Sequence, residues 1–129
     1  MSNNTTRTIY VSRNGNSNQL KLRDSEGHNP GNDNLTTGVD PGDTVKWQLD
    51  SNSGLSSIEG VQQVTASDPS YNANAVNLLS GISSTGGVYT GTVVSPSPGQ
   101  GKFENYKIGF KVPNDNNTYW DDPKLQMNK

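Results

Sequence analysis

Apolar and polar residues alternate with a period of two in several short segments of this chain. Such alternation gives a strand one buried and one solvent-facing side, so each segment is predicted to be a β-strand. The clearest segments are 7–13, 19–23, 44–49, 88–94, 103–112 and 124–128. Turn formers separate them, and Asn14-Gly15-Asn16 predicts a hairpin between the first two strands.

Three other stretches fit the alternation poorly. Between 55 and 65 the residues Ile58, Val61 and Val64 are three apart, which predicts a strand with an irregularity. From 68 to 82 we expect a loop with room for one helical turn, because Asp68-Pro69 can start a helix. From 24 to 38 nearly every residue is a turn former, which predicts an exposed loop.

Seven to eight short strands separated by turns predict an all-β, Greek-key β-sandwich. It should form a single domain over 1–129, with residues 1–6 as a flexible N-terminal segment. The inward-facing positions of the strands should build one core. They are Ile9, Val11, Val45, Trp47, Leu49, Ile58, Tyr106, Ile108, Phe110, Val112 and Leu125.

The composition indicates a thin core with long polar loops. Only 28% of residues are hydrophobic and 17% are charged, with a formal net charge of −2. The ten basic residues are spread along the chain, so we expect no nucleic-acid partner. Without an apolar run of about 18–20 residues or a secretory leader, we expect no membrane association and a cytoplasmic location. An exported form whose leader has been removed is the alternative.

The segment 40–50, which contains Pro41-Gly42-Asp43-Thr44-Val45-Lys46-Trp47, is a tight turn feeding a strand. It resembles the corresponding entry in cupredoxin-like sandwiches, and the long strand 106–112 and the closing segment 120–127 support the resemblance. The resemblance implies a cupredoxin-like fold. In copper-binding members it also implies a histidine downstream of this entry, and cysteine, histidine and usually methionine ligands in the loop joining the last two strands.

The residues that would hold copper are missing from this sequence. Segment 51–58 has no histidine, loop 113–123 has neither cysteine nor histidine, and the whole chain has no cysteine. A blue-copper site needs a thiolate and two imidazoles. We therefore predict the fold without copper, with no metal site and no cofactor.

Other candidate chemistry is sparse. His28 is the one histidine and sits in a predicted loop, so we interpret it as a solvated side chain rather than a ligand or base. No Gly-x-Ser-x-Gly segment marks a nucleophile. Asp121 and Asp122 are adjacent and would point to opposite faces of a strand, unlike a glycosidase pair. We predict no catalytic residues.

Loop 113–123 is the first choice for a ligand site. It combines two aromatic residues with three carboxylates, and the candidate residues are Asp115, Tyr119, Trp120, Asp121 and Asp122. An exposed Trp120 could stack on a sugar ring, whereas a buried one would pack over the end of the sandwich. Calcium held by the Asp and Asn oxygens is a further alternative, although no EF-hand spacing is present.

The expected function is therefore that of a non-catalytic, copper-free, cupredoxin-like β-sandwich that acts by binding or assembly. The alternative is a carbohydrate- or calcium-linked recognition module that uses loop 113–123. A hydrolase with residues scattered over several loops ranks last. The sequence does not identify a partner, and a carbohydrate and another protein are the two candidates.

Overall fold

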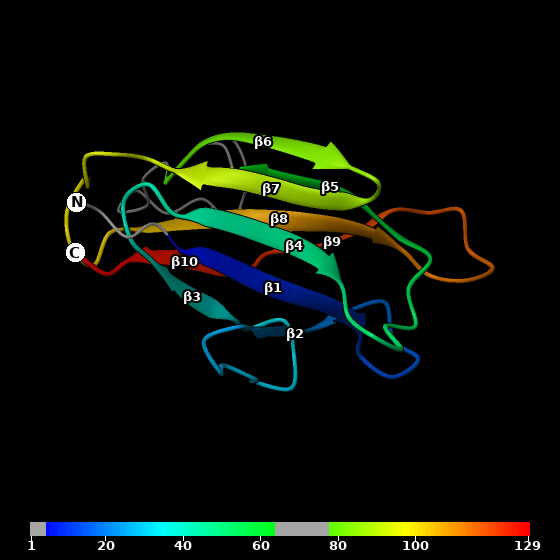
Figure 1. Ribbon diagram of the computed structural model, residues 1–129. Helices are drawn as coiled ribbons and strands as arrows, with labels where there is room; N and C mark the ends of the chain where they lie inside the picture. Colours follow the sequence, from blue (N-terminus) through cyan, green and yellow to red (C-terminus); the bar gives the residue numbers. More distant parts are fainter. Residues whose placement is uncertain (1–4, 64–77) are drawn as a thin grey trace.

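Two β-sheets lie over one another in the computed structural model, which describes residues 5–63 and 78–129 (Figure 1). The first sheet has the order β2-β1-β4-β7-β6. The second has the order β3-β10-β8-β5, with β9 added to β8. The ten strands are β1 Thr6–Arg13, β2 Leu20–Asp24, β3 Thr36–Val39, β4 Thr44–Leu49, β5 Ser57–Gln63, β6 Leu79–Thr85, β7 Val88–Val93, β8 Phe103–Lys111, β9 Tyr119–Asp121 and β10 Lys124–Met127.

Both sheets are mixed. Strand β1 pairs antiparallel with β2 and parallel with β4, while β10 pairs parallel with β3 and antiparallel with β8. Strands β10 and β9 pair with different parts of β8: β10 with residues 103–105 and β9 with residues 108–110. The all-β, two-sheet prediction is confirmed, as is the β1–β2 hairpin, but residues 5–63 and 78–129 already contain ten strands rather than seven to eight.

The turn before β4 forms as its sequence predicts. Asp43 N donates to Asp40 O at 3.1 Å across the turn, and Gly42 has φ +83°, the conformation that a type II turn requires at this position. The Asp43 carboxylate is buried and accepts hydrogen bonds from Thr5 N and Arg7 Nε, each at 2.9 Å. This carboxylate therefore ties the start of β1 to the start of β4.

The core between the sheets is centred on Trp47 of β4 and Tyr106 of β8. The indole Nε1 donates to Tyr106 Oη at 3.1 Å, and the rings meet edge to face with centroids 5.4 Å apart. Ten of the eleven predicted core residues are buried. Leu49 is the exception at 36% exposed, because it ends β4 beside a groove that Ile58 and Val88 also line.

Three strands differ from the sequence-based expectation. The 24–38 prediction of an exposed loop is wrong in part, because β3 begins at Thr36, and Leu35 and Thr37 are buried. Strand β6 begins at Leu79, so residues 79–82 of the expected loop lie in a strand. The part of that prediction from 68 to 77 lies outside the described residues. Strand β9 lies within the predicted loop 113–123.

The irregularity predicted for 55–65 is confirmed within the described part of that segment. The register of β5 against β8 shifts between Ile58 and Gly60. This shift brings Gly60 opposite Gly109 of β8, which itself lies opposite Trp120 of β9. The bulge therefore helps to build the outer surface described next.

In the ranges 5–63 and 78–129 no helix is long and apolar enough to cross a membrane.

Candidate functional site

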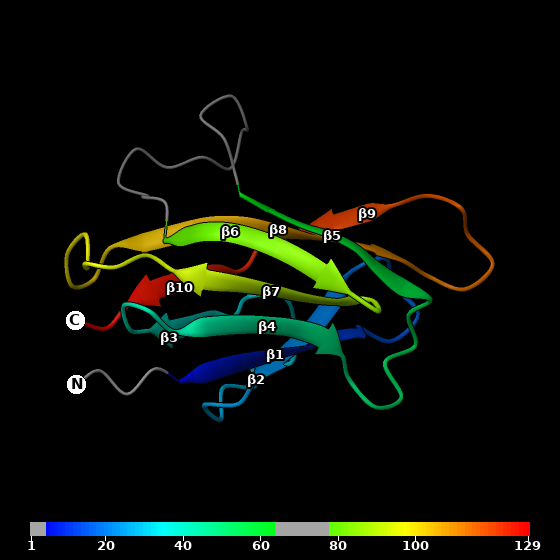
Figure 2. The same ribbon diagram turned by 45° about the horizontal axis from the view of Figure 1, so that its top comes forward.

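The indole of Trp120 lies flat against two glycines on the outer face of the second sheet. Its strand, β9, pairs with β8 on the side away from β5, and Figure 2 shows it at the upper right. A β-carbon added to Gly109 would be 2.7 Å from Trp120 Cη2, and one added to Gly60 would be 3.2 Å from the same atom. Only glycine at Gly109 leaves space for the ring in this position. We call Trp120, Gly109 and Gly60 the indole platform.

Part of the Trp120 residue reaches solvent. Trp120 is 40% exposed, one of two exposed large hydrophobic residues in the described part of the chain. Lys107 Nζ lies over the ring, 5.2 Å from its centroid, within cation–π range. Gln62 brings its amide close to Gly60, with Nε2 3.8 Å from the β-carbon position there. The platform is thus an aromatic surface with an ammonium and an amide beside it.

The other predicted site residues do not join Trp120 on this face. Tyr119 turns toward Phe110 of the core, with ring centroids 6.1 Å apart, and donates from Oη to Asp115 Oδ2 at 2.6 Å. This hydrogen bond lowers the pKa of Asp115 and ties the loop to β9. Alternation along β9 therefore divides the predicted group between the two faces of the strand.

Asp121 has a structural contact with the opposite sheet. Its Oδ2 accepts from Leu20 N at 2.6 Å, which joins β9 to the start of β2. Burial, together with the neighbouring carboxyls of Asp33 and Asp122, raises the pKa of Asp121 to about 6. Asp122 follows on the exposed side. The structure thus brings Asp115 and Tyr119 together and leaves Trp120 on a separate surface.

A second group of ionisable side chains lies where β2 turns toward β3. Asp24 ends β2 with its carboxylate fully buried; Oδ1 accepts from Glu26 N and His28 N, each at 3.0 Å. Asp24 Oδ2 lies 2.8 Å from His28 Nδ1 and accepts from Thr37 Oγ1 at 2.7 Å. The hydrogen bond to Asp24 raises the pKa of His28, and the nearby charges of Asp24 and Glu26 add to this.

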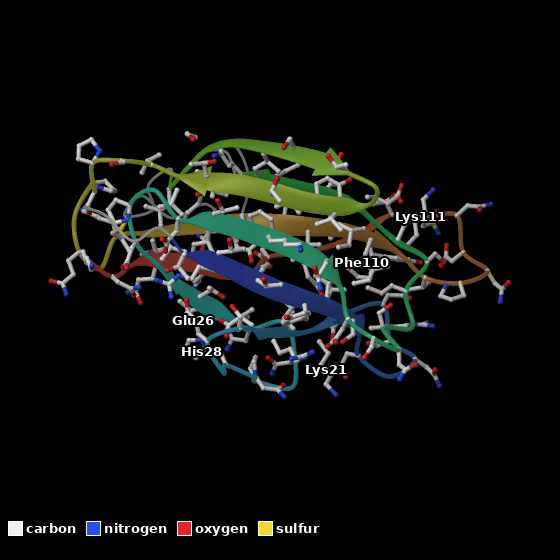
Figure 3. The ribbon with its side chains drawn as sticks, in the orientation of Figure 1. Lys21, Glu26, His28, Phe110 and Lys111 are labelled. Carbon is white, nitrogen blue, oxygen red and sulfur yellow. The ribbon has the colours of Figure 1, made fainter. Side chains whose placement is uncertain are left out.

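Glu26 completes this group, and Figure 3 shows it beside His28. Its Oε2 lies 3.2 Å from Arg7 Nη1, and its Oε1 accepts from Gly38 N at 3.3 Å. Burial raises the pKa of Glu26, while Arg7 acts in the opposite direction. We call Asp24, Glu26 and His28 the β2–β3 corner.

A groove of about 670 Å³ opens beside this corner. Glu26 and His28 line it together with the side-chain amides of Asn29, Asn34, Gln126 and Asn128. Sequence reasoning interpreted His28 as a solvated loop residue and missed the corner. The available signal was the Asp-x-Glu-x-His spacing at the end of an alternating strand, since a turn after Asp24 brings alternate residues to one side.

Comparison with models of known protein families gives no match, and comparison with curated proteins finds no similar sequence.

Proposed function

We propose that this chain is a non-catalytic, copper-free binding domain of cupredoxin-like architecture that recognises a neutral carbohydrate on the indole platform. The observation that carries the proposal is the position of Trp120. One side of its ring is supported by Gly109 and Gly60, and the residue is 40% exposed. A tryptophan held flat at the surface offers a preorganised stacking surface, because little side-chain freedom is lost when a ligand binds.

The chemistry around the ring favours a polyol over a purely apolar partner. A pyranose places a face of C–H groups on an aromatic ring while its hydroxyls point outward. The ammonium of Lys107 lies over the indole. A sugar stacked on the ring displaces this ammonium, which stays close enough to donate a hydrogen bond to a sugar hydroxyl. The Gln62 amide beside Gly60 supplies both a donor and an acceptor.

The cupredoxin-like part of the proposal rests on where the resembling segments lie. The strand entered through Pro41-Gly42 is β4, which is central in the first sheet. Strand β8, which includes most of 106–112, is central in the second sheet, and the closing segment supplies β9 and β10. The sequence has no cysteine and one histidine, so the chain cannot supply the thiolate and two imidazoles of a blue-copper centre.

Affinity electrophoresis through gels containing soluble polysaccharides tests this function directly. The panel is xylan, mixed-linkage β-glucan, galactomannan and starch, each compared with a gel that contains no polysaccharide. We expect at least one neutral polysaccharide to retard the wild-type protein, and Trp120→Ala to abolish the retardation. Trp120→Phe keeps a smaller flat ring and should retain part of it.

Tyr10→Ala is the matched control, because Tyr10 is a partly exposed aromatic residue on the first sheet. Like Trp120 it has a cation over its ring, with Arg23 Cζ 4.1 Å from the ring centroid. This variant should migrate as the wild type in every gel. Retardation that persists in Trp120→Ala, or that Tyr10→Ala removes equally, contradicts the platform. Failure of the whole panel to retard the wild type also counts against the proposal.

A further inference from the structure

The β2–β3 corner brings three potential metal ligands of mixed chemistry close together. His28 Nδ1 is 2.8 Å from Asp24 Oδ2 and 3.8 Å from Glu26 Oε1, and the three donor atoms all lie within 4.8 Å of one another. Donors that share one zinc ion at about 2.0–2.2 Å lie roughly 3 to 4 Å apart. The three side chains therefore already stand close to the spacing that one ion requires.

Two of these ligands are held in place by other groups. The buried Asp24 is fixed by backbone N–H groups on Oδ1 and by Thr37 on Oδ2. Glu26 is fixed by Arg7 and by Gly38 N. Such supporting contacts orient ligands and typically change metal affinity by about 10- to 100-fold.

The charge around the corner also favours a bound cation. Arg7 contacts the carboxylates of Glu26, Asp40 and Asp43. Lys129 contacts Asp40, and the Asp24 carboxylate contacts His28. The network therefore has two more carboxylates than permanent cations, and His28 is the remaining basic group. Within the described residues, the buried oxygen Asp40 Oδ1 has no hydrogen-bond partner.

The adjoining groove provides access from solvent. It is lined by both Glu26 and His28 and has a volume of about 670 Å³, enough for an ion to enter with water ligands. It is distinct from the indole platform, which lies on the outer face of the second sheet. Binding at the corner is therefore independent of the proposed carbohydrate function.

We propose that the β2–β3 corner is a binding site for one divalent metal ion of the zinc class, with His28 Nδ1, Asp24 Oδ2 and Glu26 Oε1 as its protein ligands. An imidazole with two carboxylates suits zinc and its neighbours, whereas calcium and magnesium prefer oxygen alone. The ion takes the place of the proton between His28 Nδ1 and Asp24 Oδ2. In a neutral imidazole that proton moves to Nε2, and an imidazolium releases one proton to solvent.

Because His28 is the one histidine of the chain, its imidazole can be followed without ambiguity by ¹⁵N NMR. The experiment titrates Zn²⁺ into tag-free, chelator-treated protein and records calorimetry and the imidazole spectrum. We expect one equivalent of Zn²⁺ to bind and to shift Nδ1 to a metal-bound frequency while Nε2 becomes the protonated nitrogen. Ca²⁺ in tenfold excess should not compete.

Two variants test the ligand set. We expect Glu26→Gln to weaken Zn²⁺ binding about tenfold or more and His28→Ala about a hundredfold. Glu59→Gln is the matched control, since Glu59 is an exposed-surface carboxylate paired with Lys111 at 3.7 Å and should bind Zn²⁺ as the wild type does. Asp24→Asn is avoided, because the loss of its buried hydrogen bonds would affect folding.

The proposal is overturned if one equivalent of Zn²⁺ leaves the imidazole resonances unchanged. Zn²⁺ binding that keeps its affinity in both Glu26→Gln and His28→Ala overturns it as well. So does Zn²⁺ bound to His28 Nε2 with an affinity that Glu26→Gln leaves unchanged. Equal binding of Ca²⁺ would show an oxygen-only site and contradict the assigned ligands. The wild-type NMR titration decides the question even if His28→Ala fails to fold.

Discussion

The two tryptophans lie on strands of the two sheets but in opposite surroundings. Trp47 is fully buried in central β4 and donates a hydrogen bond to Tyr106 of the facing sheet. Trp120 is 40% exposed on the three-residue strand β9, supported by Gly60 and Gly109. Side chains of both sheets enclose the first ring, whereas glycines support one side of the second. The ring that is enclosed should stabilise the fold, and the ring that is supported should be available for binding.

The largest expected effect is that of Trp47→Ala. Removing this ring leaves a large cavity and takes the hydrogen-bond partner from the buried Tyr106 hydroxyl. We expect the free energy of unfolding to fall by about 3–5 kcal/mol. Urea denaturation followed by circular dichroism measures it. A loss no larger than that of Trp120→Ala would erase the distinction between the two tryptophans.

The buried region also contains a carboxyl group whose titration affects stability. Glu104 lies two residues before Tyr106 on β8. Its Oε1 accepts from Leu78 N at 2.8 Å, and its buried Oε2 has no hydrogen-bond partner among the described residues. Burial raises the pKa of Glu104 to about 7. The folded state thus holds this proton more tightly than the unfolded chain, whose pKa is about 4.3. This contribution is complete below pH 4 and is lost as the pH rises through 7.

We therefore expect the free energy of unfolding to decrease from pH 5 to pH 8, with Glu104 contributing on the order of 2 kcal/mol of the decrease. Burial raises the pKa of Asp121 too, so the wild-type slope has more than one source. The difference between wild type and Glu104→Gln isolates Glu104. Urea denaturation at four pH values would contradict the assignment if the two proteins showed the same slope.

Gly109→Ala tests the support beneath the exposed ring. The new β-carbon would stand 2.7 Å from Trp120 Cη2, so the indole must move off the sheet. We expect a stability loss of about 1 kcal/mol and a loss of at least about tenfold in carbohydrate affinity. Gly81→Ala is the control, because it makes the same substitution in a strand where the added β-carbon has open space. Equal affinities of the two variants would show that the flat ring position is unimportant.

The smallest expected effect on stability is that of Trp120→Ala. The residue is already 40% exposed, so removal of its ring leaves no enclosed cavity. We expect the free energy of unfolding to fall by no more than about 1 kcal/mol, equal to a few degrees in melting temperature. Differential scanning calorimetry measures this. A larger drop would identify the ring as a structural element and remove the basis for the site.

The regular alternation predicted much of this fold, because it reports which side of a strand is buried. Tyr106, Ile108 and Phe110 alternate without interruption, and all three are buried. Strand β3 was missed because it is only four residues long, Thr36–Val39, and follows a long run of turn formers. Its position depends on parallel pairing with β10, nearly ninety residues later in the chain, which local pattern cannot reveal.

The candidate sites were predicted less completely, for a related reason. The sequence marked Trp120 as an aromatic residue in a polar loop, but not that it stands opposite Gly109 with its indole against Gly60. That arrangement needs the register of three strands and the bulge in β5. His28 likewise gains its significance from the buried Asp24 carboxylate, whose burial follows from Thr37 and β3.

The most direct test of the indole platform compares both tryptophans in one spectrum. The chain has two indole N–H groups, and the signal missing from Trp120→Ala identifies each of them. An oligosaccharide taken from the polysaccharide that retards the protein is titrated in while both signals are recorded. We predict that the Trp120 signal shifts until the binding site is saturated. The signal of Trp47, whose N–H is hydrogen-bonded to Tyr106, should stay in place. Saturable binding that leaves the Trp120 signal unmoved would contradict the account.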